Sequence, residues 1–291
     1  MIEDSLSTTR QRVLTRAVSL TGDRCMTLRE WPGAGTPVVL LHGLLDTAEG
    51  WDDLARTSAR PFFAFDLPGF GGSSMPTRPR ISAYAEDAIA GIDALGLDRC
   101  ILVGHSVGGA VAVSVAESLG DHVAAMVLLA PAGFGRIHLA EAVSLPGIRN
   151  LTERVLPLAL ANRRVLDLAY RAMVTAGQTP SSGVIERVTR DALTSTPGAR
   201  EATRAVVAAG LSERAFHRRQ VDYNGPVRAI WGERDRLVPV SHGRALARSL
   251  PQAVVEIWPG MGHHPQHERP AALAEVVESA RARRWRVLRA A

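Results

Sequence analysis

The sequence predicts an α/β fold in which a mostly parallel central sheet is flanked by helices and carries a helical insertion. Two observations support this prediction. Short apolar runs are followed by glycine and then by segments with helical periodicity, and this alternation is typical of a doubly wound sheet. Between residues 133 and 222 the alternation stops, and leucine, valine and arginine recur at helical spacing instead.

Six runs are the predicted strands, and the first four are continuously apolar rather than alternating with polar residues. Continuous apolarity indicates strands that are buried on both faces, as in a parallel sheet. The runs are PVVLLHG from Pro37, FFAF from Phe62, CILVGHS from Cys100, AAMVLLAP from Ala124, PVRAIWG from Pro226 and AVVEIWPG from Ala253.

Helical patterns follow these runs. One helix is predicted over residues 82–96, with Ser82 placed to cap it and Gly96 placed to end it. A second follows Ser106, and two later helices begin near Ser241 and Arg269.

The block from residue 133 to residue 222 is predicted to form several short helices, because prolines interrupt its helical pattern. These prolines are Pro146, Pro157, Pro180 and Pro197. We therefore expect one α/β core, made of residues 1–132 and 223–291, with a helical cap inserted at residues 133–222.

The composition is that of a soluble globular protein with a proper core, since 46% of the 291 residues are hydrophobic and 22% are charged. The net charge of +5 comes from arginine alone and is dispersed, which argues against a nucleic-acid partner. The arginine-rich tail from residue 281 is expected to be the solvated end of a final helix. The oligomeric state is left open.

The expected location is the cytoplasm. No run approaches the ~20 apolar residues that span a bilayer, so we expect no stable membrane insertion, and no signal peptide is recognisable. The two cysteines, Cys25 and Cys100, fall in segments predicted as buried strands rather than in a disulfide framework. A reducing compartment fits that usage best.

Residues 104–108 read GHSVG, a G-x-S-x-G motif that places Ser106 between an apolar strand and a helical pattern. The chain must turn sharply at this serine, and the glycines two residues to either side relieve the crowding of that turn. The turn lies at the carboxyl edge of the sheet, where open α/β sheets bind ligands. We expect the Ser106 hydroxyl to project from this edge.

A serine hydroxyl needs a base to become a nucleophile, and the base needs an acid to orient it. Two later loops at the same edge supply both kinds of group. Asp235 follows the run PVRAIWG, and a histidine-rich segment follows the next run. The three groups therefore occur in the order serine, acid, histidine.

Together these motifs resemble those of the α/β-hydrolase fold superfamily, specifically its single-domain serine hydrolases with a helical cap. The resemblance covers nearly the whole chain, through VVLLHG, DLPGFGGSS, VGHSVGG, WGERDRLVP and GHHPQHERP. The family's base lies in a G-H-x-P-x-x-E-x-P pattern, which selects His263 here. The resemblance implies a Ser106–Asp235–His263 catalytic triad, in which the acid holds the imidazole tautomer.

The resemblance also implies an oxyanion hole. His42 and Gly43 match the start of the family's oxyanion loop, which makes the backbone NH of Leu44 one donor and that of Val107 the other. We expect His42 itself to brace the loop through a hydrogen bond. Asp66 is expected to hold a glycine-rich turn near the pocket rather than to act in catalysis.

Three histidines within five residues, His263, His264 and His267, could suggest a metal site. Pro265 disfavours a helix through the first and the last of them, because proline lacks an amide hydrogen and restricts the preceding residue. We therefore expect neither a metal nor a cofactor. His264 is predicted as a pocket or rim residue and His267 as a surface residue, and the candidate substrate contacts are His264 and His105.

The predicted reaction is the hydrolysis of a carboxylic ester, or a related small-molecule acyl substrate, through an acyl-enzyme. Members of the superfamily that act on halides or epoxides use an aspartate where this chain has Ser106. Acyl transfer and perhydrolysis differ only in the second nucleophile and stay open.

Two other functions stay open as well. The segment LLAPAGFG resembles the corresponding region of carbon–carbon bond hydrolases that act on aromatic ring-cleavage products. The loop HGLLDTAEGW lacks the glycine- and proline-rich oxyanion sequence of those enzymes. The same scaffold can also serve as a non-catalytic ligand-binding or accessory protein.

Overall fold

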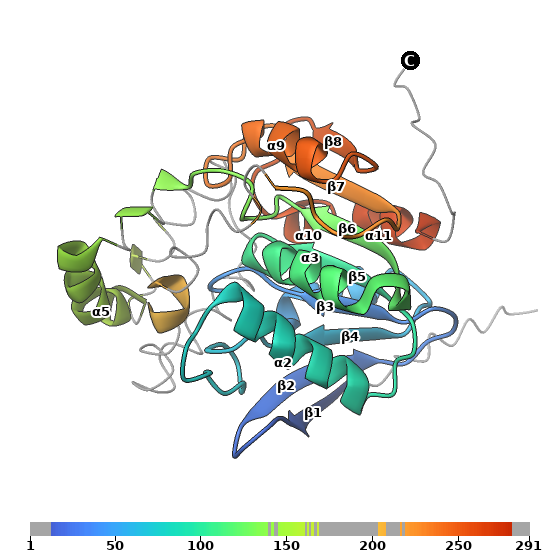
Figure 1. Ribbon diagram of the computed structural model, residues 1–291, viewed down its shortest axis with the longest axis horizontal. Coiled ribbons are helices and arrows are strands. Elements are labelled where there is room, and N and C mark those ends of the chain that lie inside the picture. Colours follow the sequence, from blue (N-terminus) through green and yellow to red (C-terminus); the bar gives the residue numbers. More distant parts are fainter. Residues whose placement is uncertain are drawn as a thin grey trace, which may run out of the picture.

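The computed structural model describes residues 13–138, 141–142, 145–160, 162, 164–165, 168, 203–207, 216 and 219–280. An eight-stranded sheet forms its centre, in the order β1-β2-β4-β3-β5-β6-β7-β8 (Figure 1). The strands are β1 Leu14–Ser19, β2 Cys25–Trp31, β3 Val38–Leu41, β4 Phe62–Phe65, β5 Cys100–His105, β6 Val123–Leu129, β7 Val227–Gly232 and β8 Val254–Trp258.

The sheet is parallel from β4 to β8, and β2 is antiparallel to both of its neighbours. The predicted class, α/β with a mostly parallel sheet, is therefore confirmed. The helices are η1 Ala48–Trp51, α1 Asp52–Ala55, α2 Ile81–Ala94, α3 Val107–Leu119, η2 Gly120–His122, α5 Pro146–Leu160, α9 Ser241–Ser249, α10 Pro265–Glu268 and α11 Pro270–Ser279.

Helices cover both faces of the sheet, so its inner strands, β3 to β7, are buried on both sides. Val39 and Leu41 of β3 point into one hydrophobic cluster, which α2, α3 and α9 complete. Val38 and Leu40 point into a second cluster on the opposite face, together with residues of α1 and α11. This two-sided burial is the physical reason for the continuously apolar runs in the sequence.

The edge strand β1 was not predicted, because its sequence lacks an apolar face. Only Val18 of its six residues is buried. Helix α2 corrects another prediction: it begins at Ile81, so Ser82 lies inside its first turn and does not cap it. The predicted stop is confirmed, since Gly96 follows the end of α2 with a φ of 65°.

Helix α5 corrects the prediction that prolines break the insertion into short pieces at Pro157. The helix starts at Pro146, a first position that suits proline, and runs through Pro157 to its end. In Figure 1 it lies apart from the layered core. Pro180, Pro197 and the arginine-rich tail lie outside the described residues.

No helix within the described ranges is both long and apolar enough to cross a membrane.

Candidate active site

Ser106 occupies the sharp turn between β5 and α3, as the G-x-S-x-G motif predicts. Its φ of 53° and ψ of −115° are strained for a residue with a side chain, at a cost of about 1–3 kcal/mol. A Cβ added at Gly104 would crowd the Gly108 carbonyl, and one added at Gly108 would overlap the carbonyl of Leu41. The two glycines thus allow the close approach that this turn requires.

The backbone of the turn is fixed on both sides of the serine. The Ser106 amide donates to the Leu129 carbonyl at 2.9 Å, which ties the turn to the neighbouring strand β6. The Ser106 carbonyl accepts the amide of Ala132 at 2.9 Å. These bonds hold the serine at the carboxyl edge of the sheet despite its strained conformation.

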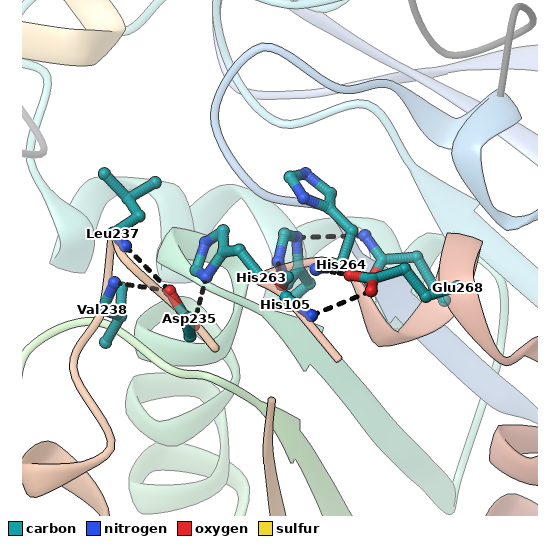
Figure 2. A network of polar contacts seen from close by, with 9 residues as sticks. His105, Asp235, Leu237, Val238, His263, His264 and Glu268 are labelled. Atoms are coloured by element: carbon teal, nitrogen blue, oxygen red, sulfur yellow. Dashed lines mark hydrogen bonds and ion pairs between the residues drawn. The ribbon is translucent and has the colours of Figure 1, made fainter. Parts of the chain in front are cut away.

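Asp235 and His263 form a buried acid–imidazole pair at the same edge (Figure 2). Asp235 Oδ2 lies 2.6 Å from His263 Nδ1, and the two side chains are 0% and 2% exposed. The other carboxylate oxygen accepts the amides of Leu237 and Val238, each at 2.9 Å. The carboxylate therefore holds the imidazole with Nδ1 as the donor, which leaves Nε2 as the basic nitrogen.

His263 Nε2 is buried and makes no hydrogen bond within the described part of the chain. The Ser106 hydroxyl is thus not hydrogen-bonded to it in this structure. Catalytic hydrogen bonds of this kind are often long in the free enzyme and tighten when substrate binds. Because Asp235 bonds to Nδ1 and no described residue bonds to Nε2, Nε2 is the nitrogen that can accept a proton.

The loop that follows β3 is braced by His42, as expected from the sequence. His42 Nε2 accepts the Leu67 amide at 2.8 Å, so Nδ1 carries the hydrogen and donates to the Gly43 carbonyl at 2.7 Å. Burial lowers the pKa of His42, in agreement with a neutral ring.

Asp66 supports the next part of this loop and lies 6% exposed. One of its carboxylate oxygens accepts the Ala48 amide at 2.7 Å. A Cβ at Gly71, whose φ is 53°, would overlap the other oxygen. Asp66 thus binds the start of η1 and lies against the glycine-rich turn, where it leaves no room for a side chain at Gly71.

The two predicted oxyanion donors are the backbone amides of Leu44 and Val107. Within the described residues, neither the Leu44 amide nor the Val107 amide donates to a protein acceptor. Leu45, which follows the first of them, has a φ of 60°. Val107 is the first residue of α3, and amides at a helix N-terminus favour negative charge.

His105 lies beneath the site with both ring nitrogens bonded to the protein. Its Nε2 donates to the His263 carbonyl at 2.8 Å, and its Nδ1 accepts from Gln266 Nε2 at 3.1 Å. Burial, followed by the nearby His263, lowers the pKa of His105 well below its ordinary value. The ring is therefore neutral and holds the backbone of the histidine loop.

His264 is 5% exposed, and its ring packs against those of His105 and His263, with centroids 4.6 and 5.2 Å away. Burial, followed by the neighbouring histidines, lowers its pKa well below the ordinary value. Glu268 accepts the amides of Gly262 and His264, at 2.8 and 3.2 Å, and so closes the loop around the base (Figure 2).

His267 is not the surface residue that the sequence predicted. Its side chain is 8% exposed, and Nε2 lies 3.0 Å from Oδ2 of the buried Asp46. As expected, no helix runs through both His263 and His267, because the short helix α10 starts only at Pro265. Across the described ranges, no group of three or more His, Cys, Asp or Glu residues is arranged to hold a metal ion.

The buried neutral histidines should make the protein less stable in acid. In the unfolded chain His105 and His264 titrate near a pKa of about 6.5, whereas their folded pKa values lie well below it. Below about pH 6.5 the unfolded state therefore binds more protons than the folded state, and the free energy of unfolding decreases as the pH is lowered. We expect a slope of about 1.4 kcal/mol per pH unit for each histidine, measured by urea denaturation.

Two substitutions test this assignment. His264→Gln should lower the slope by about 1.4 kcal/mol per pH unit, because the unfolded state then takes up one proton fewer. His138→Gln is the control, since the His138 side chain is 86% exposed, and it should leave the slope unchanged. Equal slopes for His264→Gln and the wild type would contradict the assignment.

Three supporting residues were not singled out from the sequence. Glu268 could have been found, because it is the glutamate of the G-H-x-P-x-x-E-x-P pattern. Asp46 and Gln266 had no such signal, since both partner with residues more than 150 positions away.

Residues 38–276 match the model of the alpha/beta hydrolase family. An uncharacterized protein of Mycobacterium tuberculosis is 30% identical over 259 residues, which cover 84% of this chain and 75% of that protein. The 2-hydroxy-6-oxo-6-phenylhexa-2,4-dienoate hydrolase of Comamonas testosteroni is 28% identical over 249 residues, which cover 81% and 84% of the two chains. A thermophilic esterase from Thermogutta terrifontis, 21% identical, superposes with a TM-score of 0.73 over 92% of this chain and 97% of that one. The chain belongs to the alpha/beta hydrolase family.

Proposed function

We propose that this protein is a serine hydrolase that cleaves carboxylic esters or related small acyl substrates through an acyl-enzyme. The observation that carries the proposal is the buried pair of Asp235 and His263, 2.6 Å apart. This pair lies at the sheet edge where the strained turn presents Ser106. The assignment agrees with the membership of the family.

In the proposed first half-reaction, Ser106 Oγ attacks the ester carbonyl carbon while His263 Nε2 removes its proton. Asp235 stabilises the imidazolium that results. The Leu44 and Val107 amides donate to the carbonyl oxygen as it becomes negative. The tetrahedral intermediate collapses, the alcohol leaves with the proton from His263, and an acyl-serine remains.

In the second half-reaction, His263 removes a proton from a water molecule that attacks the acyl carbon. The bond to the serine oxygen breaks, Ser106 regains a proton from His263, and the carboxylic acid leaves. The net change is the addition of one water across the ester bond, so no cofactor is required.

The two candidate substrate contacts receive different proposed roles. His105 has both ring nitrogens bonded within the protein, so we assign it to positioning His263 rather than to binding substrate. His264 is retained as a candidate substrate contact, because its ring adjoins that of His263 at 5.2 Å. Residues 1–132 and 223–291 would be the core and residues 133–222 the cap that selects the substrate, in a cytoplasmic enzyme.

A fluorophosphonate probe tests whether Ser106 is activated. We expect the wild type to lose ester hydrolysis as it gains one phosphonyl group, and mass spectrometry should locate that group on Ser106. Heat-denatured protein is the control, because labelling must depend on the folded site. A folded protein that resists the probe would favour the non-catalytic, ligand-binding alternative.

A second candidate function is the hydrolysis of carbon–carbon bonds in ring-cleavage products. It is favoured by the named relatives from Comamonas testosteroni and Burkholderia cepacia, at 28% and 27% identity. Parallel measurement of kcat/KM on p-nitrophenyl esters of increasing acyl length and on a vinylogous diketone acid separates the two. A higher value on the diketone acid would replace the esterase proposal.

A further inference from the structure

Helix α10 begins two residues after the proposed base, and each of its polar side chains binds a different part of the site. Gln266 bonds to His105 at 3.1 Å, next to the nucleophile. Glu268 accepts two amides of the histidine loop. His267 lies 3.0 Å from Asp46, which belongs to the loop after β3. The third contact connects the histidine loop with the loop that holds the proposed oxyanion donor.

Asp46 and His267 form a second buried acid–imidazole pair beside the first. Their side chains are 1% and 8% exposed. Burial by itself raises the pKa of Asp46, but the facing His267, followed by the hydrogen bond from the Thr47 amide, outweighs it, and the net pKa lies well below the ordinary value. The carboxylate is therefore ionised at neutral pH, and a buried carboxylate of this kind needs its partner.

The loop between Gly43 and Thr47 needs such an anchor because its backbone is strained. Leu45 has a φ of 60°, which a residue with a branched side chain rarely adopts. On the amino-terminal side, His42 fixes the Gly43 carbonyl. On the carboxyl-terminal side, Asp46 is fixed by His267 and accepts the Thr47 amide at 2.9 Å.

We propose that Asp46 and His267 are positioning residues that fix the Leu44 amide relative to His263, so that the oxyanion donor and the base act on one carbonyl group. This proposal rests on the serine hydrolase mechanism above. Both side chains act through the loops they join and not by contact with the reacting atoms. Loss of one oxyanion donor costs about a hundredfold or more in turnover, and a displaced donor should cost part of that.

The test compares Asp46→Ala, His267→Ala and the double variant on a p-nitrophenyl oxoester and the matching thionoester. Sulfur is the poorer hydrogen-bond acceptor, so an enzyme that uses an oxyanion hole prefers the oxoester. We expect kcat on the oxoester to fall by about ten- to a hundredfold, with KM little changed. The preference for the oxoester should fall as well, and the double variant should be no worse than the worse single variant.

Two further variants separate positioning from general stability. Asp87→Ala removes another buried carboxylate, 5% exposed and 2.6 Å from Arg24, which lies away from the site. It should lower stability and leave the preference for the oxoester unchanged. His267→Gln should recover part of kcat, because its amide can still donate to Asp46.

The preference is the ratio of the activities on the oxoester and the thionoester, measured on one preparation. Incomplete folding of a variant lowers both activities by the same factor and leaves this ratio unchanged. An unchanged preference in the Asp46 and His267 variants, with activity that still depends on Ser106, would overturn the positioning role alone. Activity that persists in Ser106→Ala would overturn the proposed function and this inference with it.

Discussion

Ser106→Ala is expected to lower kcat for p-nitrophenyl ester hydrolysis by about a millionfold relative to the wild type, while the protein remains folded. The reason is that no other group in the proposed mechanism can form the acyl-enzyme once the hydroxyl is lost. Loss of the nucleophile in a comparable triad has an effect of this order. Initial rates and burst amplitudes on a short-chain ester measure the change.

Ser106→Gly is the matched control for the fold. Glycine accepts a φ of 53° without the strain that a side chain carries there, so this variant should be as inactive as Ser106→Ala but more stable. We expect the free energy of unfolding to rise by about 1 kcal/mol relative to the alanine variant. Activity above background in both variants would show that another residue is the nucleophile.

The central part of this site could be predicted because its signals are local in the sequence. Ser106 lies in a motif between a strand run and a helical pattern, and Asp235 and His263 each follow a strand run closely. In a parallel sheet the carboxyl ends of neighbouring strands meet at one edge. The order of the strands was therefore enough to bring the acid and the base together, and the 2.6 Å contact between them agrees with this.

The residues that hold the loops of the site in place could not be predicted, because they act through contacts between loops that are distant in the sequence. His267 and Asp46 are 221 positions apart and share no motif. His267 follows a proline in a polar segment, a pattern that is typical of surface residues. It is buried only because the loop after β3 packs against it. The edge strand β1 could not be predicted for a related reason, since the sheet buries one of its residues, Val18, and leaves the others exposed.

His263→Ala should reduce kcat about as much as Ser106→Ala, by about a millionfold, because the serine is then left without a base. The neighbouring His264→Ala should retain measurable turnover. The contrast follows from the structure: His263 is the histidine that Asp235 holds at 2.6 Å, whereas His264 packs by its ring against other histidines. Steady-state kinetics on the same ester compare the two variants.

The combined variant Ser106→Ala/His263→Ala makes the assignment sharper. If the two residues act as one unit, the double variant should be no slower than either single variant, because each single change already removes acyl-enzyme formation. If His263 acted only by packing, its loss would multiply with the loss of Ser106. If His264→Ala were inactive and His263→Ala active, His264 would be the base instead of His263. The contact between Asp235 and His263 would then have no catalytic role.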